Sequence, residues 1–268
     1  MRVVSPLNYA YAIGRIRALE RRLLSRETLA KMIDADPADA MRLLTETGFG
    51  GGESAHIGDG AALEALLEKE RRQLAALVDG LLLDDDLRPL LANEPLPAVP
   101  ALLRRRPRGF LADFLRQWID VENLRTFVRR RLLEDPPERL AAALLPEGNL
   151  SEREWLTLYS LDTTALLHRL EYVRLPDRLL DYRRELGEAV QATLRERSFS
   201  HLEKSIHDFF IARLKPAKFM AFGPEPLLAF YFARRNEIDL VRLVMLGKIN
   251  DVPVERLKNR INDVYTAN

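Results

Sequence analysis

Acidic and basic side chains recur at matched positions when this 268-residue sequence is shifted against itself by 117 residues. Asp120 falls on Glu237, and Arg125 falls on Arg242. An acid five residues before an arginine can tie neighbouring turns or helices together, or it can line a wall that faces a charged partner. The sequence leaves both roles open at these four positions.

Other residue types offer little chemistry. The chain has no cysteine, which excludes thiolate nucleophiles, disulfides and cysteine-bound zinc. The glycines of residues 48–52 are not followed by the Gly-Lys-Ser/Thr of a P-loop, so we expect a flexible turn there. Four histidines are present, and His201 and His207 are six residues apart, about 240° from each other on a helix. We therefore predict no catalytic residue, no metal and no cofactor.

The composition predicts a folded protein whose overall electrostatic field is weak. The 41 Lys and Arg residues almost balance the 40 Asp and Glu residues, for a formal charge of +1. A charge near zero does not draw a protein to nucleic acid or anionic lipid, so any electrostatic partner must meet a local patch. The densest apolar stretch, residues 227–233, is far shorter than the 18 or more residues of a spanning helix, and no apolar run of signal-peptide length opens the chain. We therefore expect no membrane span.

The fold class predicted is all-α. Leucine occurs 49 times, against 32 Val, Ile and Thr residues together, and unbranched side chains lose little rotamer freedom in a helix. Capping signals predict helices that begin after Asp36, after Asp135 and after Ser151, the last with the capping-box acid Glu154. The acidic run at residues 84–86 predicts a helix start or a turn.

The 117-residue repeat extends through a turn and into a following helix without a gap. The pairs that share their class of side chain include Phe114/Tyr231, Val121/Ile238, Arg131/Lys248, Pro136/Pro253 and Leu140/Leu257. A weaker copy of the pattern lies at residues 9–24. We predict three similar helical units about a pseudo-threefold axis in a single compact globule, with approximate limits 1–110, 111–210 and 211–268.

Three groups of residues also carry a resemblance to a known family: an opening group (Tyr9, Tyr11, Arg15, Arg17, Glu20), a middle group (residues 118–124 and 129–131) and a closing group (residues 226–231 and 236–238, Arg242, Lys248, residues 255–257 and Tyr265). In order and spacing these groups resemble the C subunit of the vacuolar/archaeal-type rotary ATPases, which is named the d subunit in the eukaryotic vacuolar enzyme. The chain is shorter than expected for that family, and the stretch after Gly52 is where we expect helices to be missing from the first unit.

The resemblance implies a funnel-shaped, non-catalytic rotor protein. Such a protein lies peripherally on the cytoplasmic face of the membrane, where it couples the central-stalk subunits to the membrane rotor ring during ATP-linked proton or sodium transport. The partners implied are the stalk and the ring, with no nucleic acid. A helical-repeat adaptor that binds another protein through a concave face is the alternative, and a soluble enzyme is disfavoured because no catalytic constellation is present.

Charged and polar residues of the repeated helices are the partner-binding candidates. Two basic clusters, residues 103–108 and 129–131, are compatible with a solvated helix face, with an acidic protein partner or, least of all, with nucleic acid. A structural role in tying helices together remains the alternative for the repeated pairs. The candidates for contact with stalk or ring are Arg15, Arg17, Asp120, Asn123, Arg125, Arg130, Arg131, Glu237, Arg242 and Lys248.

Overall fold

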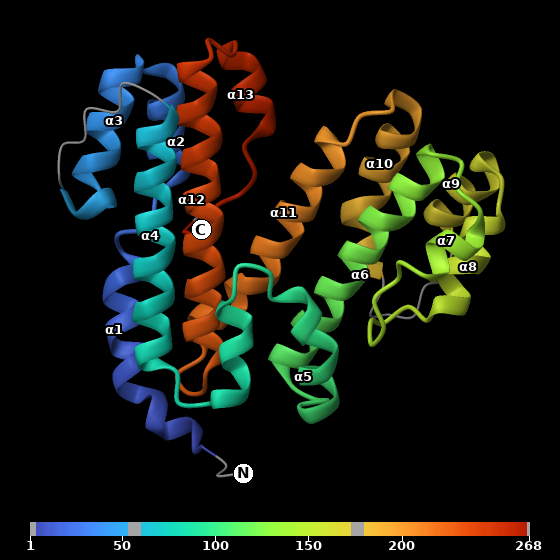
Figure 1. Cartoon of the computed structure of the whole chain (residues 1–268), viewed down its shortest axis with the longest axis horizontal. Coiled ribbons are helices and arrows are strands. Elements are labelled where there is room, and N and C mark those ends of the chain that lie inside the picture. The colour runs from blue at the N-terminus through green and yellow to red at the C-terminus, as the bar shows by residue number, and fades with distance from the viewer. Residues whose placement is uncertain (1–3, 53–59, 173–179, 267–268) are drawn as a thin grey trace. The chain divides into compact units, whose positions relative to one another are not determined.

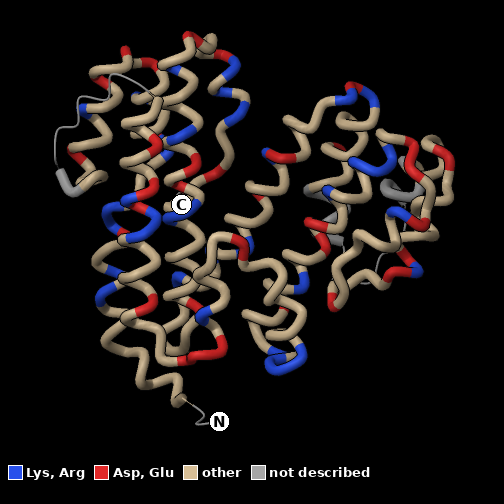
Figure 2. The backbone as a smooth tube through the Cα atoms, in the orientation of Figure 1, with Lys and Arg blue, Asp and Glu red and all other residues tan. Residues whose placement is uncertain are grey.

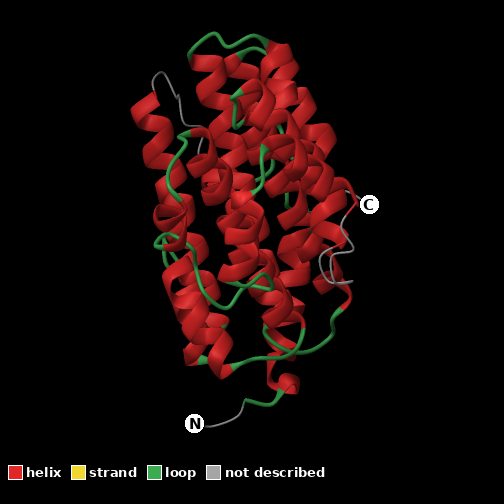
Figure 3. Cartoon of the chain, turned by 90° about the vertical axis from the view of Figure 1, so that its right-hand side faces the viewer, coloured by secondary structure: helices red, strands yellow, loops and turns green. Residues whose placement is uncertain are grey.

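The computed structural model describes residues 4–52, 60–172 and 180–266, and every regular element among them is a helix (Figure 1, Figure 3). The all-α prediction is confirmed. The chain divides into two compact units: unit 1 combines Met1–Asn93 with Ile211–Asn268, and unit 2 is Glu94–Phe210. The three-unit arrangement about a pseudo-threefold axis stays a prediction.

Unit 1 is built around two long antiparallel helices, α4 (Gly60–Leu81) and α12 (Glu225–Ile249), which lie side by side (Figure 1). Buried side chains run along α12 from Pro226 to Gly247, so this helix forms the core of the unit. The other elements of unit 1 surround this pair: η1 (Pro6–Tyr9), α1 (Ala10–Glu20), α2 (Arg26–Asp34), α3 (Pro37–Glu46), η2 (Phe49–Gly52), η3 (Asp85–Leu91), η6 (Lys215–Phe219) and α13 (Val254–Arg260).

Unit 2 is organised by α6 (Phe110–Leu132), the longest of its helices. Its apolar core contains Phe127, Trp155 and Phe209, contributed by helices far apart in the sequence. The ring of Phe127 lies against those of Trp155 and Tyr159, with centroids 5.7 Å and 5.5 Å away. The remaining elements are η4 (Leu96–Ala98), α5 (Val99–Arg105), α7 (Pro137–Ala141), α8 (Glu152–Ser160), α9 (Thr163–Tyr172), α10 (Leu180–Glu196) and α11 (Ser200–Leu214), whose last turn belongs to unit 1.

Two of the three predicted N-caps are confirmed. Asp36 accepts the backbone N–H of Asp39 at 2.8 Å, and Ser151 forms a capping box with Glu154. The prediction for Asp135 is wrong in its detail, because the N-cap is Pro136 and the carboxylate of Asp135 pairs instead with two arginines. The acidic run at residues 84–86 begins the η3 turn, as the sequence predicts.

The helices α6 and α12 end in the same backbone motif, at positions 117 residues apart. Glu134 and Asp251 both adopt left-handed backbone conformations, with φ of 55° and 52°. The next amide reaches back five residues in each copy, from Asp135 to Arg130 O (3.0 Å) and from Val252 to Gly247 O (2.8 Å). This is a Schellman motif, which satisfies the last carbonyls of a helix.

The equivalence continues into the short helix that follows. Arg139 donates its amide to Pro136 O at 3.0 Å, and Arg256 donates to Pro253 O at 2.9 Å. The leucines at the next position, Leu140 and Leu257, are both buried. The gapless register of the sequence repeat therefore has a matching local geometry. Among the described residues, no non-glycine residue near the end of α1 has a positive φ, so the third, weaker copy does not share this motif.

Replacing the two left-handed residues by glycine tests the motif in both copies. Glu134→Gly and Asp251→Gly are each expected to raise the free energy of unfolding by about 0.5–1 kcal/mol, because glycine adopts this conformation without a Cβ clash. Urea denaturation measures the change. Glu138→Gly, inside α7, is the control and is expected to lower stability by a similar amount. A loss of stability at position 134 or 251 would contradict the assignment.

Candidate functional site

Asp120 and Asn123 lie buried on α6, where they hold the chain segment that follows α7. Asp120, 2% exposed, accepts the amides of Asn149 (3.0 Å) and Leu150 (3.2 Å). Asn123, 1% exposed, both donates to and accepts from the backbone of Leu145, at 2.9 Å and 2.8 Å. Buried polar groups are costly unless they are paired, so both residues stabilise the fold of unit 2.

Arg125 joins α6 to α11. Its guanidinium donates to both carboxylate oxygens of Glu203, at 2.9 Å and 2.7 Å, and also contacts Glu122 one turn earlier. Bidentate pairs of this kind fix geometry as well as charge. The cluster thus places two acids, Glu122 and Glu203, around one cation, and all three side chains are partly buried.

Arg130 contacts the chain just before α7, and Arg131 contacts the last turn of α8. Arg130 donates to Asp135 at 2.9 Å, and this pairing lowers the pKa of Asp135. Arg131 donates to the carbonyl of Tyr159 at 2.7 Å, and the hydroxyl of Tyr159 donates to the carbonyl of Asp135 at 2.6 Å. The second basic cluster is thus largely engaged within unit 2. In the first cluster, Arg104 forms an exposed ion pair with Glu147 at 3.5 Å.

Glu237 lies on α12 in a buried cluster that joins four segments of unit 1. Its carboxylate contacts the guanidinium of Arg234 and accepts the amide of Leu24 at 2.9 Å. Arg234 also donates to Glu70 of α4 at 2.9 Å, and Glu70 accepts the amide of Gly50 at 2.8 Å. Burial raises the pKa of Glu237 to about 7, with the negative charge of Glu70 adding to the effect and Arg234 opposing it. We call Glu70, Arg234 and Glu237 the buried charge cluster.

Arg242 and Lys248 contact different partners further along α12. Arg242 donates to Glu64 of α4 at 2.6 Å, in a pair whose side chains are 49% and 40% exposed. Lys248 donates to the carbonyl of Ile33 at 2.8 Å and contacts that of Ala35. These carbonyls end α2, so the ammonium group satisfies acceptors that the helix leaves open.

The two α1 candidates differ in environment. Arg17 forms an ion pair with Glu20 and donates to the carbonyls of Ala217 and Met220, both at 3.0 Å. It thereby fastens the segment before α12 to α1. Arg15 is exposed and makes no salt bridge to a described residue. The ten candidates are thus divided between the two units, and each contact described above runs to a residue outside the set of candidates.

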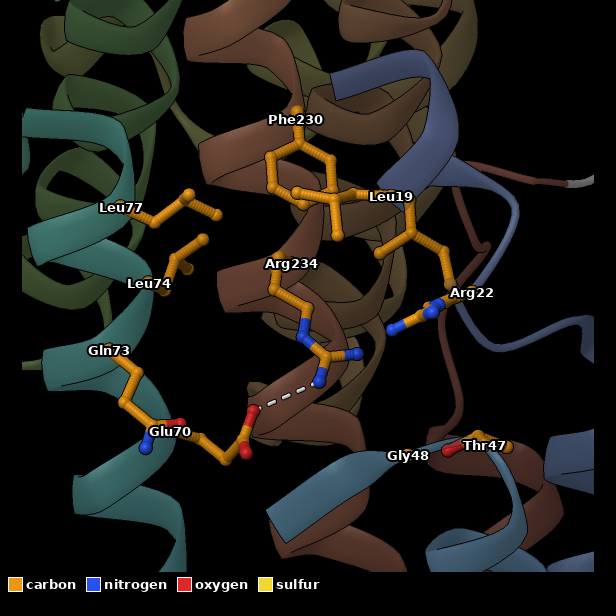
Figure 4. Close-up of a pocket in the computed structure, with 11 residues that line it drawn as sticks. Leu19, Arg22, Thr47, Gly48, Glu70, Gln73, Leu74, Leu77, Phe230 and Arg234 are labelled. Carbon is orange, nitrogen blue, oxygen red and sulfur yellow. Dashed lines mark hydrogen bonds and ion pairs between the residues drawn. The ribbon is translucent and has the colours of Figure 1, made fainter. Parts of the chain in front are cut away.

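A pocket of about 210 Å³ opens beside the buried charge cluster in unit 1 (Figure 4). Apolar side chains including Leu74 and Phe230 line one part, while Glu70, Gln73 and Arg234 line the other. The guanidinium of Arg22 extends toward that of Arg234 (Figure 4). The guanidinium of Arg234 also lies 4.7 Å from the ring centroid of Phe49.

The glycine turn beside this pocket has a structural explanation. Residues 49–52 form η2, and Gly50 has a φ of 76°, a conformation that favours glycine. A Cβ at Gly50 would meet Leu66 at 2.9 Å, and the amide of Gly50 is held by Glu70. The turn thus brings a backbone donor to the buried charge cluster.

The described residues contain no group of three or more His, Asp or Glu side chains placed to hold a metal ion. His56 lies outside the described residues, whereas His201 is exposed and lies 3.6 Å from Glu196. In the parts of the chain that the structure describes, no helix is both long enough and apolar enough to cross a bilayer.

Residues 101–260, 160 of the 268 in the chain, match the family described as ATP synthase (C/AC39) subunit. The chain belongs to this family. A relative, the C subunit of the V-type sodium ATPase of Enterococcus hirae, is 41% identical over 64 residues, which cover 24% of this chain and 20% of the relative. The alignment therefore spans about a fifth of the relative's length.

The region that matches the C/AC39 family runs from α5 to the end of α13 and includes both copies of the repeat. Eight of the ten candidates lie inside it, whereas Arg15 and Arg17 lie before it. For all ten candidates, contact with a partner stays a prediction.

Sequence reasoning missed Glu70 and Arg234, the two members of the buried charge cluster outside the repeated pairs. The residue that corresponds to Arg234 in the first copy is Gln117, so a search for matched charges passes over it. The signal available was local, because Arg234 stands three residues before Glu237, a spacing that places both on one helix face. No sequence signal points to Glu70 on α4.

The raised pKa of Glu237 predicts a specific pH dependence. Between pH 4.5 and about 7 the folded state binds more protons at this carboxyl than the unfolded state, so stability from Glu237 falls as pH rises. Relative to Glu237→Gln, the wild type is expected to lose about 3 kcal/mol of unfolding free energy across this window and then to remain level. Urea unfolding at several pH values measures the difference. A difference that is independent of pH would contradict the buried, proton-binding state of Glu237.

Charge reversal separates the roles of Lys248 and Arg242. Lys248→Glu is expected to lower the free energy of unfolding by about 1–3 kcal/mol. The substitution leaves the carbonyls at the end of α2 without their donor and adds an acid beside them. Arg242→Glu breaks a half-exposed pair and is expected to cost about 1 kcal/mol or less. Thermal unfolding checks both. Equal losses would mean that Lys248 does not stabilise the end of α2.

Proposed function

We propose that this C/AC39 family member is a non-catalytic rotor protein that couples the central stalk of a V/A-type ATPase to its membrane rotor ring. The observation that carries the proposal is the family match over residues 101–260. The relative from the V-type sodium ATPase supports the same assignment. In this role the protein is peripheral on the cytoplasmic face, and its partners are the stalk subunits and the ring.

The contacts inside each unit suit the transmission of torque. A coupling must resist deformation, and close-packed helical interiors with satisfied polar groups have low compressibility. In unit 1 the buried charge cluster joins α4, α12, η2 and the start of α2 through ionic contacts and backbone amides. In unit 2 Asp120, Asn123 and Arg125 join α6 to the segments around it.

Charges of both signs are interspersed along the helices of each unit (Figure 2). Such a surface offers local complementarity to several partners without a single dominant field, which sets register and partner choice more than affinity. The half-exposed pair between Arg242 and Glu64 is one place where a partner's charge could compete with an internal one.

Reconstitution of the rotary complex from its subunits, with and without this chain, tests the proposal. We expect the purified chain to hydrolyse no ATP, and we expect ATP-driven ion transport by the complex to require it. Transport is measured by ion uptake into vesicles, and ATP hydrolysis by the catalytic subunits is measured in parallel. ATP turnover intrinsic to the chain, or full transport in its absence, would contradict the coupling role.

A further inference from the structure

The pocket of about 210 Å³ in unit 1 has an apolar wall on one side and charged groups on the other (Figure 4). Its lining comes from α4, from α12, from the end of α1 and from the turn at residues 47–48, all of which belong to unit 1. The apolar wall includes Leu19, Leu74, Leu77 and Phe230. A pocket of this composition suits a ligand that is itself part apolar and part charged.

Arg22 supplies a cation to the pocket that is not used elsewhere in unit 1. It follows the end of α1, and its guanidinium makes no hydrogen bond or ion pair with a described residue. The group extends toward the guanidinium of Arg234 (Figure 4). Two positive groups that face each other repel, so an anion between them is stabilised by both.

Arg234 is fixed in position and still has hydrogen-bond donors left for a ligand. Its side chain is 16% exposed and contacts the carboxylates of Glu70 and Glu237. These contacts engage two of the five N–H donors that a guanidinium carries. The other donors have no acceptor among the described residues. An oxyanion in the pocket can therefore accept from Arg234 while both ion pairs stay intact.

The acid that lines the pocket does not neutralise both arginines. The charged side chains of the lining are Arg22, Glu70 and Arg234, which leaves one positive charge unbalanced. One carboxylate oxygen of Glu70 accepts the amide of Gly50 at 2.8 Å, and the other accepts from Arg234 at 2.9 Å. Both oxygens of Glu70 are thus engaged within the fold, and the charge of Arg22 is available to a ligand.

We propose that this pocket binds a small amphipathic carboxylate, with its charged group between Arg22 and Arg234 and its tail against the apolar wall. Guanidinium groups match the planar, two-oxygen geometry of a carboxylate. A cavity of about 150 Å³ holds a benzene molecule, so a pocket of this volume has room for a tail of about five to eight carbons. The bound ligand links the end of α1 to α4 and α12. The inference does not depend on the proposed coupling role.

Isothermal titration calorimetry of the full chain with hexanoate tests the proposal. We expect one hexanoate to bind per chain, and we expect Arg22→Gln to weaken binding at least about tenfold, because a hydrogen bond to a charged group contributes roughly that factor or more. Arg21→Gln is the matched control. It removes the same charge from the neighbouring residue, which is exposed and does not line the pocket, so the affinity is expected to stay unchanged. Circular dichroism verifies that each variant is folded.

Three further probes separate the charged part of the ligand from its tail. Acetate carries the charge without the tail, hexan-1-ol carries the tail without the charge, and inorganic phosphate is an anion of another kind. Each is expected to bind at least about tenfold more weakly than hexanoate, because every buried methylene contributes about fourfold and the ion pairs contribute separately. Acetate or phosphate that binds as tightly as hexanoate would show that the apolar wall is not used, and would overturn the proposed ligand class.

Gln73→Glu provides an independent measurement on the α4 side of the pocket. Gln73 is exposed and lines the pocket, and the substitution adds a negative charge with little change of shape. It is expected to weaken hexanoate binding by about threefold or more at low salt and by less at high salt. An unchanged or increased affinity would contradict the position of the carboxylate.

The remaining outcomes also decide the proposal. Wild type that does not bind hexanoate, or that binds it no more tightly than folded Arg22→Gln, would overturn the site. Equal losses in Arg21→Gln and Arg22→Gln would assign binding to the general charge of this segment and would overturn it as well. None of these results bears on the coupling role, which the transport measurement tests separately.

Discussion

Burial of charge at one point of α12 is the constraint on which unit 1 depends. Arg234 lies between the carboxylates of Glu70 and Glu237, and each carboxylate also accepts a backbone amide from another segment. A buried charge without its partner is costly, so removal of one member leaves the others uncompensated. The cluster therefore couples the positions of α4, η2 and the start of α2, because each contacts the same group of buried charges.

The two copies of the repeat preserve roles more than contacts. Asp120 and Glu237 are both buried acceptors of backbone amides, although they hold different segments of the chain. Arg125 and Arg242 both pair with a glutamate on another helix, Glu203 in one case and Glu64 in the other. Of the two roles that the sequence left open, the internal tie is thus seen at all four positions, and contact with a partner stays a prediction.

Local features of the fold could be predicted from the sequence, because caps and helix ends are determined by neighbouring residues. Asp36, Ser151 and the paired turns after α6 and α12 are of this kind. Contacts between distant segments could not be predicted. Lys248 satisfies carbonyls more than 200 residues away, and nothing in its own neighbourhood indicates that target. Most partner-binding candidates turned out to have such long-range contacts within their own unit.

The exposure of aromatic side chains in unit 1 could not be predicted from the sequence either. Aromatic residues in helical patterns are more often core than contact, and Tyr9 and Tyr231 are indeed buried. Tyr11 is exposed because it lies on the opposite face of α1, a distinction that requires knowledge of which face packs. Phe219 and Phe222 are in a segment without helical periodicity, so no pattern predicts their exposure.

Hydrogen exchange at two backbone amides tests the central role of the buried charge cluster most directly. The amide of Leu24 is held by Glu237 and that of Gly50 by Glu70, and Arg234 joins the two carboxylates. In a folded Arg234→Met variant, we predict that both amides lose protection together, by about tenfold or more. Unchanged protection at both amides, or a loss confined to one, would contradict the account.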